Sequence, residues 1–267
     1  MRILPCLATF AALAISAPAF AADLAPEQPE VAAALGHEWR YQATLYGWLT
    51  AVNGDVGIRG LPPVDVDVTI GDLLENIDKL DGAFMGSFYA TNGTWMVLTD
   101  LMWSRVRDDV TFGPAGGTVN YEQSQVIASA IVGYALPLDV PNLQLSATAG
   151  VRYNHLKAEL DIDPVLLPRL FPGSERVGRQ DWADPIVGLS AHYDINEKWF
   201  VNALADVGGF GVGSKITAQG FLAVGYNWTE AISTAIGYRA IYTNYDHDGF
   251  VYDTTMHGPF TSIAFHF

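Results

Sequence analysis

The apolar residues of this chain are dispersed rather than gathered into long runs, and this limits the folds it can adopt. Half of the 267 residues are hydrophobic. Beyond residue 21, however, no run approaches the ~20 apolar residues of a membrane-spanning helix. From Trp39 onward, segments of roughly ten to fifteen residues alternate apolar side chains with polar or small ones, which is the period-two pattern of a β-strand.

The clearest alternating segment is Leu143–His155. Successive side chains in a strand point to opposite sides, so one face of this segment is apolar and the other is polar or small. Four further segments repeat the pattern, the last of them least regularly: Val126–Leu136, Ala218–Trp228, Ala231–Thr243 and Thr94–Arg107. A soluble β-sandwich gives the same alternation, so the pattern alone leaves both folds open.

Aromatic residues near the strand ends favour a membrane barrel over a sandwich. Trp95 and Trp103 share a face eight residues apart, which is about 20 Å along the membrane normal for a tilted strand. Other aromatics cluster near strand ends on the apolar face: Tyr134, Tyr153, Tyr193, Tyr226, Trp228, Tyr238 and Tyr242. Two such belts are typical of the aromatic girdles of transmembrane barrels.

The connections between these segments alternate in length. Short connections are expected at Asn92-Gly93, Pro137–Asn142, Asn196-Glu197 and Thr229-Glu230, and long ones at Asn53–Leu80, Arg107–Thr118, Glu159–Trp182, Gly208–Lys215 and Asn244–Thr254. Short periplasmic turns and long extracellular loops are the outer-membrane layout. The sequence therefore predicts an all-β fold: a single antiparallel transmembrane β-barrel of about ten strands (eight to twelve) over residues 38–267. The stretch Val64–Thr69 is a candidate extension of a strand pair above the membrane.

Both ends of the chain carry export signals. Residues 1–21 have Arg2, an apolar stretch and a small-residue site ending at Ala21, which predicts a signal peptide cleaved there or one residue later rather than a membrane anchor. Residues 22–37 are polar and are expected to form a flexible periplasmic lead. The final strand places Ile263, Phe265 and Phe267 on one face, which resembles the terminal signature read by the barrel-assembly machinery.

Composition excludes several classes of site. The lone cysteine, Cys6, lies in the signal segment, so the mature chain has neither disulfides nor thiolate ligands. With 14 Lys+Arg against 29 Asp+Glu, the chain is not expected to bind nucleic acid. We predict no cofactor and no metal site.

Several motifs resemble a widespread, largely uncharacterised family of Gram-negative outer-membrane β-barrel proteins. They are Leu45–Trp48, Asp72–Leu74, Gly150–Arg152, Trp182–Pro185, Asp206–Ser214, Gly237–Arg239, Tyr245-Asp246, Gly249–Asp253, Gly258-Pro259 and Phe265–Phe267. In broad plan the family is similar to the small barrels of the outer membrane protein A and surface-antigen type. The resemblance implies fold and outer-membrane location, and it transfers no catalytic residue and no substrate.

The polar strand faces carry charges of both signs. The residues concerned are Arg40, Asp100, Arg152, Asp184, His192, Asp206 and Arg239. If these faces line the lumen, the charges form either an ion-pair network that closes the pore or a charged constriction that selects small solutes. A barrel of about ten strands is filled by its side chains, which favours the network.

Four other motifs have weaker chemical interpretations. The segment from Asn244 to Gly249 resembles the start of a calcium loop but is better explained as a polar hairpin turn. The glycines of Gly208–Gly213 lack the other residues of a phosphate loop and favour a tight turn. Asp72–Ile77 has helical spacing with Asp72 as a possible cap. Pro164–Phe171 is an apolar loop segment, and Arg169, Arg176 and Arg179 are either lipopolysaccharide contacts or solvated.

These features predict a role in surface structure or as a narrow small-solute pore. The alternatives are loop-mediated binding or adhesion and, less favoured, a protease or lipid-modifying enzyme that would use rim histidines such as His155, His247 and His257. The expected partners are outer-membrane lipid, lipopolysaccharide and the assembly machinery, with the barrel as a monomer.

Overall fold

The structure is a computed structural model that describes residues 38–57, 63–112, 117–162 and 175–267. Its strands are β1 (Arg40–Trp48), β2 (Ala51–Gly57), β3 (Val64–Val68), β4 (Leu80–Thr91), β5 (Trp95–Phe112), β6 (Gly117–Ala135), β7 (Leu143–Ile162), β8 (Glu175–Asp194), β9 (Trp199–Gly208), β10 (Ile216–Asn227), β11 (Ile232–His247) and β12 (Phe250–His266). Two short helical segments follow β3: α1 (Ile70–Glu75) and η1 (Ile77–Lys79).

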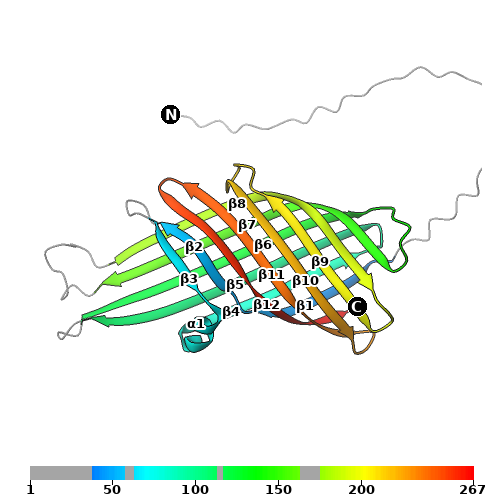
Figure 1. Ribbon diagram of the computed structural model, residues 1–267, viewed down its shortest axis with the longest axis horizontal. Coiled ribbons are helices and arrows are strands. Elements are labelled where there is room, and N and C mark those ends of the chain that lie inside the picture. The colour runs from blue at the N-terminus through cyan, green and yellow to red at the C-terminus, as the bar shows by residue number, and fades with distance from the viewer. Residues whose placement is uncertain (1–37, 58–62, 113–116, 163–174) are drawn as a thin grey trace, which may run out of the picture. The chain divides into compact units, whose positions relative to one another are not determined.

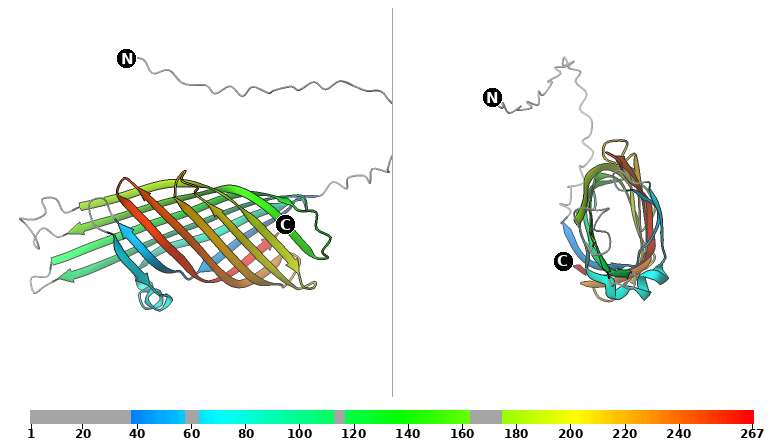
Figure 2. Two further views of the ribbon diagram at one scale, coloured as in Figure 1. Left: turned by 45° about the horizontal axis from the view of Figure 1, so that its top comes forward. Right: turned by 90° about the vertical axis from the view of Figure 1, so that its left-hand side faces the viewer.

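Ten of these strands, β1 and β4 to β12, form a closed antiparallel barrel. Each strand pairs with its neighbour in the chain, and β1 closes the ring on β12 from Gln42↔His266 to Trp48↔Phe260. Figure 2 shows the closed ring of strands end-on. The predicted strand number and topology are therefore confirmed.

The outward face of the barrel is apolar and the inward face is largely polar or small. In β7, Val151 is 48% exposed while its neighbour Arg152 is fully buried. Leu222 of β10 and Ile236 of β11 are 57% and 70% exposed. An outward apolar band on a closed barrel is the surface of a protein that spans a membrane with strands.

No helix in the described part of the chain is long and apolar enough to cross a membrane.

The end that carries the short turns also carries both ends of the barrel chain. Tyr41 and Phe267 exchange backbone hydrogen bonds there, at 2.9 and 3.0 Å. We call this end periplasmic, because periplasmic turns are short in outer-membrane barrels. The opposite end is then extracellular.

Three links that the sequence assigns to loops are mostly strand. β5 and β6 extend to Phe112 and from Gly117, and β7 and β8 extend to Ile162 and from Glu175. The predictions at Arg107–Thr118 and Glu159–Trp182 were therefore wrong, because polar residues fill odd and even positions alike in these segments, so that their sequence resembles a loop. We call the segments Arg107–Phe112, Gly117–Glu122, Lys157–Ile162 and Glu175–Arg179 the extracellular wall.

The third misassigned link, Asn244–Thr254, is a tight hairpin. β11 and β12 pair up to His247↔Phe250, and the turn is made by Asp248 and Gly249 with φ of 51° and 80°. Positive φ at both central residues is the geometry of a two-residue hairpin turn. The interpretation of this segment as a hairpin turn is confirmed.

The strand pair β2–β3 adds to the extracellular half of β12, as the sequence suggested for Val64–Thr69. The chain then turns through α1, which projects beside β4 (Figure 1). Its N-cap is Thr69 rather than the predicted Asp72. Asp72 is the third helical residue and completes a capping box, in which its carboxylate accepts from the Thr69 backbone N–H at 2.9 Å.

The predicted apolar segment Pro164–Phe171 and Arg169 lie outside the described residues, as do the predicted signal peptide and periplasmic lead.

Candidate functional site

The barrel interior contains a layer of buried, mutually bonded polar side chains. Arg152 of β7 donates through Nη2 to both carboxylate oxygens of Asp206 on β9, at 2.9 and 2.8 Å. The same guanidinium donates to Gln219 Oε1 at 3.1 Å and to Thr217 Oγ1 at 3.2 Å. Both members of this ion pair are almost completely buried.

A second ion pair crosses the barrel. Arg239 of β11 donates to Asp100 Oδ1 on β5 at 2.8 Å, and these strands are separated by three strands on one side of the ring and five on the other. The Tyr46 hydroxyl accepts from Arg239 at 3.0 Å and donates to Asp100 Oδ2 at 2.8 Å. Gln219 Oε1 also accepts from Arg239 at 3.1 Å, so this single oxygen joins the two arginines.

We call these six residues the polar layer: Tyr46, Asp100, Arg152, Asp206, Gln219 and Arg239. Their side chains come from six strands and are linked into one hydrogen-bonded group. Buried charges are tolerated only when they are paired and hydrogen-bonded. The layer meets this condition, and its bonds join opposite walls of the barrel.

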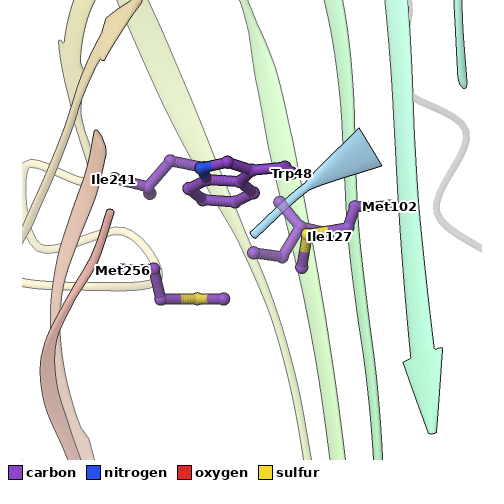
Figure 3. Close-up of a cluster of buried hydrophobic side chains, with 5 residues drawn as sticks. All are labelled: Trp48, Met102, Ile127, Ile241 and Met256. Atoms are coloured by element: carbon purple, nitrogen blue, oxygen red, sulfur yellow. The ribbon is translucent and has the colours of Figure 1, made fainter. Parts of the chain in front are cut away.

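An apolar layer lies on the extracellular side of the polar layer. It consists of Trp48, Met102, Ile127, Ile241 and Met256, all at most 5% exposed. Figure 3 shows these side chains reaching inward from different parts of the barrel wall and meeting around the Trp48 ring.

Trp48 connects the apolar layer to the polar layer. Its indole N–H donates to the Gly258 carbonyl at 3.2 Å. The Arg239 guanidinium carbon lies 5.1 Å from the centroid of the Trp48 ring, within the range of a cation–π contact.

Two further apolar clusters bracket these layers along the strands. Ile131, Ile186 and Leu204 lie on the periplasmic side. On the extracellular side, Trp182 of β8 stacks on Tyr245 of β11 with ring centroids 4.2 Å apart. This second cluster also contains Leu156, Phe250 and Tyr252. The interior is therefore occupied by side chains at four successive levels.

The structure joins four of the seven predicted charged residues into the polar layer: Asp100, Arg152, Asp206 and Arg239. Asp184 is fully buried on the inward face, but its Oδ1 accepts from the Ser214 backbone N–H at 2.6 Å rather than from an arginine.

Arg40 and His192 lie near the periplasmic end, away from the polar layer. Arg40 is exposed at the first residue of β1. His192 contacts Asn202 at 2.7 Å and Asp194 at 3.1 Å. His192 is eight residues from Asp184 on one strand, which corresponds to about 20 Å along the barrel.

Sequence reasoning missed the uncharged residues of the interior, among them Tyr46, Trp48 and Gln219. Alternation does mark them, because Tyr46 and Trp48 share the inward face of β1 and Gln219 shares the inward face of β10 with Ala223. Charge was used as the criterion for lumen chemistry, and these three side chains are uncharged.

A second polar cluster lies on the outward face of the extracellular rim. Asp181 Oδ1 accepts from the Tyr153 hydroxyl at 2.5 Å and contacts His155 Nδ1 at 2.6 Å, while Oδ2 accepts from Arg179 at 3.0 Å. Tyr153, then His155 and Arg179, hold the pKa of Asp181 at about 2, below the ordinary 3.8. His155 is the predicted rim histidine that the structure pairs with a carboxylate at hydrogen-bond distance.

The other two predicted rim histidines have different surroundings. His257 contacts the Tyr238 hydroxyl at 2.6 Å and Asn53 at 2.9 Å. His247 is exposed and lies 3.6 Å from Asp248. In the portion of the chain that the structure describes, no three His, Cys, Asp or Glu side chains are arranged to hold a metal ion.

The chain has structural similarity to solved outer-membrane barrels. The outer membrane protease OmpT from Escherichia coli aligns with a TM-score of 0.49 and 10% identity, over 86% of this chain and 97% of that one. Ail, the attachment invasion locus protein of Yersinia pestis, aligns with a TM-score of 0.36 and 9% identity, over 86% of this chain and 98% of that one. OprG from Pseudomonas aeruginosa aligns with a TM-score of 0.34 and 13% identity, over 87% of this chain and 98% of that one.

These structures belong to the class of small Gram-negative outer-membrane barrels that the sequence motifs resemble. At such low identity no residue role passes from them to this chain. No protein-family model matches the sequence, and no curated protein matches it.

Proposed function

We propose that this chain is an outer-membrane protein whose barrel is closed to solutes and holds the extracellular wall at the cell surface. The observation that carries the proposal is the polar layer, in which Arg239 and Asp100 bond across the barrel. A solute would have to separate two buried ion pairs and then displace the Trp48 cluster. Removing one partner of a buried pair costs about 3–5 kcal/mol, so spontaneous opening is rare.

Electrical recording in planar bilayers tests closure. We expect the purified protein to insert without conductance steps. The variant Tyr46→Ala with Trp48→Ala, Asp100→Ala and Arg239→Ala removes side chains from the polar and apolar layers, the two central levels of the four. If it folds, we expect it to conduct more than the unmodified protein.

The pore alternative predicts the opposite result. Discrete steps from the unmodified protein that change when Asp100→Asn or Arg152→Gln is introduced would contradict closure and support a charged constriction. Resistance to unfolding on unheated gels provides the folding control for each variant.

Loop-mediated binding is the second candidate, and the length of β5 to β8 favours it. These strands have 18 to 20 residues, whereas about nine to eleven suffice to span a membrane. A variant in which Lys157 and Arg179 are joined by an Asn-Gly turn removes the β7–β8 part of the wall. If it inserts normally but loses attachment of whole cells to a surface, the wall is the functional part.

The enzyme alternative centres on the outward His155–Asp181 pair. A hydrolase also needs a nucleophile within reach of the histidine, and among the described residues no hydroxyl forms a hydrogen bond with His155 Nε2. We expect His155→Ala to leave the lipid composition of the outer leaflet and the cleavage of added peptides unchanged.

Four expectations complete the proposal. The signal peptide is removed after Ala21, the barrel is a monomer, and Ile263, Phe265 and Phe267 serve as the assembly signal. These three side chains are 39%, 41% and 69% exposed on the outward face of the final strand, so a receptor that binds the strand edge could contact them. The last expectation is contact with outer-membrane lipid and lipopolysaccharide.

A further inference from the structure

We propose that the outward face of β4, β5 and β6 binds one lipopolysaccharide molecule, with a lipid phosphate on Arg105 and Arg107 and an acyl chain in the groove below. The proposal rests on the proposed outer-membrane location, and it does not depend on whether the barrel is closed to solutes. Its test uses purified protein, so its outcome is separable from the conductance result.

The first observation is a cation pair at the upper edge of the apolar band. Arg105 and Arg107 lie two and four residues beyond Trp103 on the same face of β5. Asp81 lies 3.8 and 3.4 Å from the two guanidinium groups, and Glu122 lies 3.5 and 2.8 Å from them. These carboxylates hold the two arginines side by side.

The second observation is that Arg105 retains donors for a ligand. Its two ion-pair distances are 3.8 and 3.5 Å, longer than an ordinary hydrogen bond, and its Nε is buried, so the donors that a ligand can reach are those of the Nη atoms. A guanidinium carries five N–H donors in a planar fork, a geometry that binds phosphate oxygens in pairs. The phosphate would approach from the membrane side, where the Arg105 side chain is partly exposed.

The third observation is an apolar groove of about 580 Å³ below the cation pair. Small residues, Ala43, Gly86 and Ala128, are part of its lining, and Phe84 and Phe88 are exposed beside them. Pockets of several hundred cubic ångströms accommodate ligands, and in the apolar band the available ligand is an acyl chain.

Trp103 connects the groove to the cations. Its ring packs over Gly82, where an added Cβ would lie 3.0 Å from it, and the Arg105 guanidinium carbon lies 5.8 Å from the ring centroid. Arg105 lies four residues beyond Leu101, which lines the groove, and this corresponds to roughly 10 Å along the membrane normal. One lipid molecule can therefore reach from the groove, at the level of the acyl chains, to the arginines at the level of the headgroups.

The whole chain has a formal charge of −15. Two neighbouring arginines on its outward face therefore indicate a specific role rather than a generally basic surface.

The segment α1–η1 borders the site. η1 packs against β5, and Leu74 and Ile77 are 53% and 50% exposed. Exposed apolar side chains beside a cationic rim are suited to contact with lipid.

Native mass spectrometry of the full-length mature protein in non-ionic detergent provides the test, with bisphosphorylated lipid A as the probe. We expect one tightly bound lipid per barrel. Arg105→Gln with Arg107→Gln is expected to weaken binding about tenfold, the loss of charged hydrogen bonds. Ala128→Leu fills the groove and is expected to weaken binding several-fold. Asp81→Asn with Glu122→Gln removes the competing carboxylates and is expected to tighten it.

The matched control is Lys198→Gln with Lys215→Gln, which removes the same charge from exposed positions next to β9 and β10, away from the groove. We expect this control to change affinity less than twofold. Equal weakening by both double variants, or unchanged binding of lipid A stripped of its phosphates, would overturn the proposal. Unchanged binding in Ala128→Leu together with competition by inorganic phosphate would assign the site to free phosphate and overturn the lipid.

Discussion

The polar layer and the Arg105–Arg107 rim are built from the same groups in opposite surroundings. Each contains two arginines and two carboxylates, the layer buried inside the barrel and the rim exposed on its outward face. Burial makes each broken pair expensive because the remaining charge cannot be hydrated. Exposure makes each pair weak, so a ligand can compete with the carboxylates for the arginines. In the functions proposed above, the same pairing therefore closes one region and binds in the other.

The largest expected effect comes from removing one charge of the buried pair. Arg152→Ala leaves Asp206 without its guanidinium, and we expect it to lower the free energy of unfolding by about 3–5 kcal/mol. Urea titration in lipid bilayers, followed by tryptophan fluorescence, measures this loss.

The paired replacement Arg152→Leu with Asp206→Leu is the control for that experiment. Since it leaves no buried charge at this pair, we expect it to be far less destabilising than the single change. A double variant as unstable as Arg152→Ala would contradict the electrostatic explanation.

Removal of one hydroxyl from the polar layer is expected to have an intermediate effect. Tyr46→Phe removes the group that accepts from Arg239 and donates to Asp100. The predicted loss is about 1–3 kcal/mol, because buried partners are left unsatisfied. The same urea titration measures this loss of unfolding free energy. A loss smaller than that of Arg107→Gln would contradict the statement that buried pairs matter more for stability than exposed ones.

The exposed rim is expected to matter little for stability. Arg107→Gln breaks the 2.8 Å contact with Glu122, and we predict a change of about 1 kcal/mol or less that shrinks further in high salt. Unfolding titrations at low and high salt check both statements.

The last expected effect is a pH dependence at the rim. The pKa of Asp181 is about 2 in the folded barrel, against 3.8 ordinarily. A lowered folded pKa means that the unfolded chain takes up the proton first, so the stabilisation is present above about pH 4 and is lost as the pH falls toward 2. Carboxyl carbon NMR should give a midpoint near 2, and a midpoint at 3.8 or above would show that the Tyr153 contact is absent.

The sequence predicted the faces of the strands correctly because side chains alternate strictly. It placed Arg152 inward and Val151 outward, as observed. Alternation contains no information about which inward residues meet across a closed ring, since that depends on register and closure. The prediction therefore grouped Asp184 and His192 with the polar layer. Only the register of the strands shows that their side chains bond elsewhere. Strand ends failed for a different reason, because the sequence of the wall lacks the regular apolar alternation that marks a strand.

The unequal strand lengths have a consequence for how this protein can vary. β9 and β10 have 10 and 12 residues, while β7 and β8 have 20 each. The interior contacts of the polar layer use only residues that lie below the wall. Insertions and substitutions at the tips of β5 to β8 would thus leave the closure untouched. Selection by antibodies or phage could remodel the surface of the cell while the barrel beneath it is inherited unchanged.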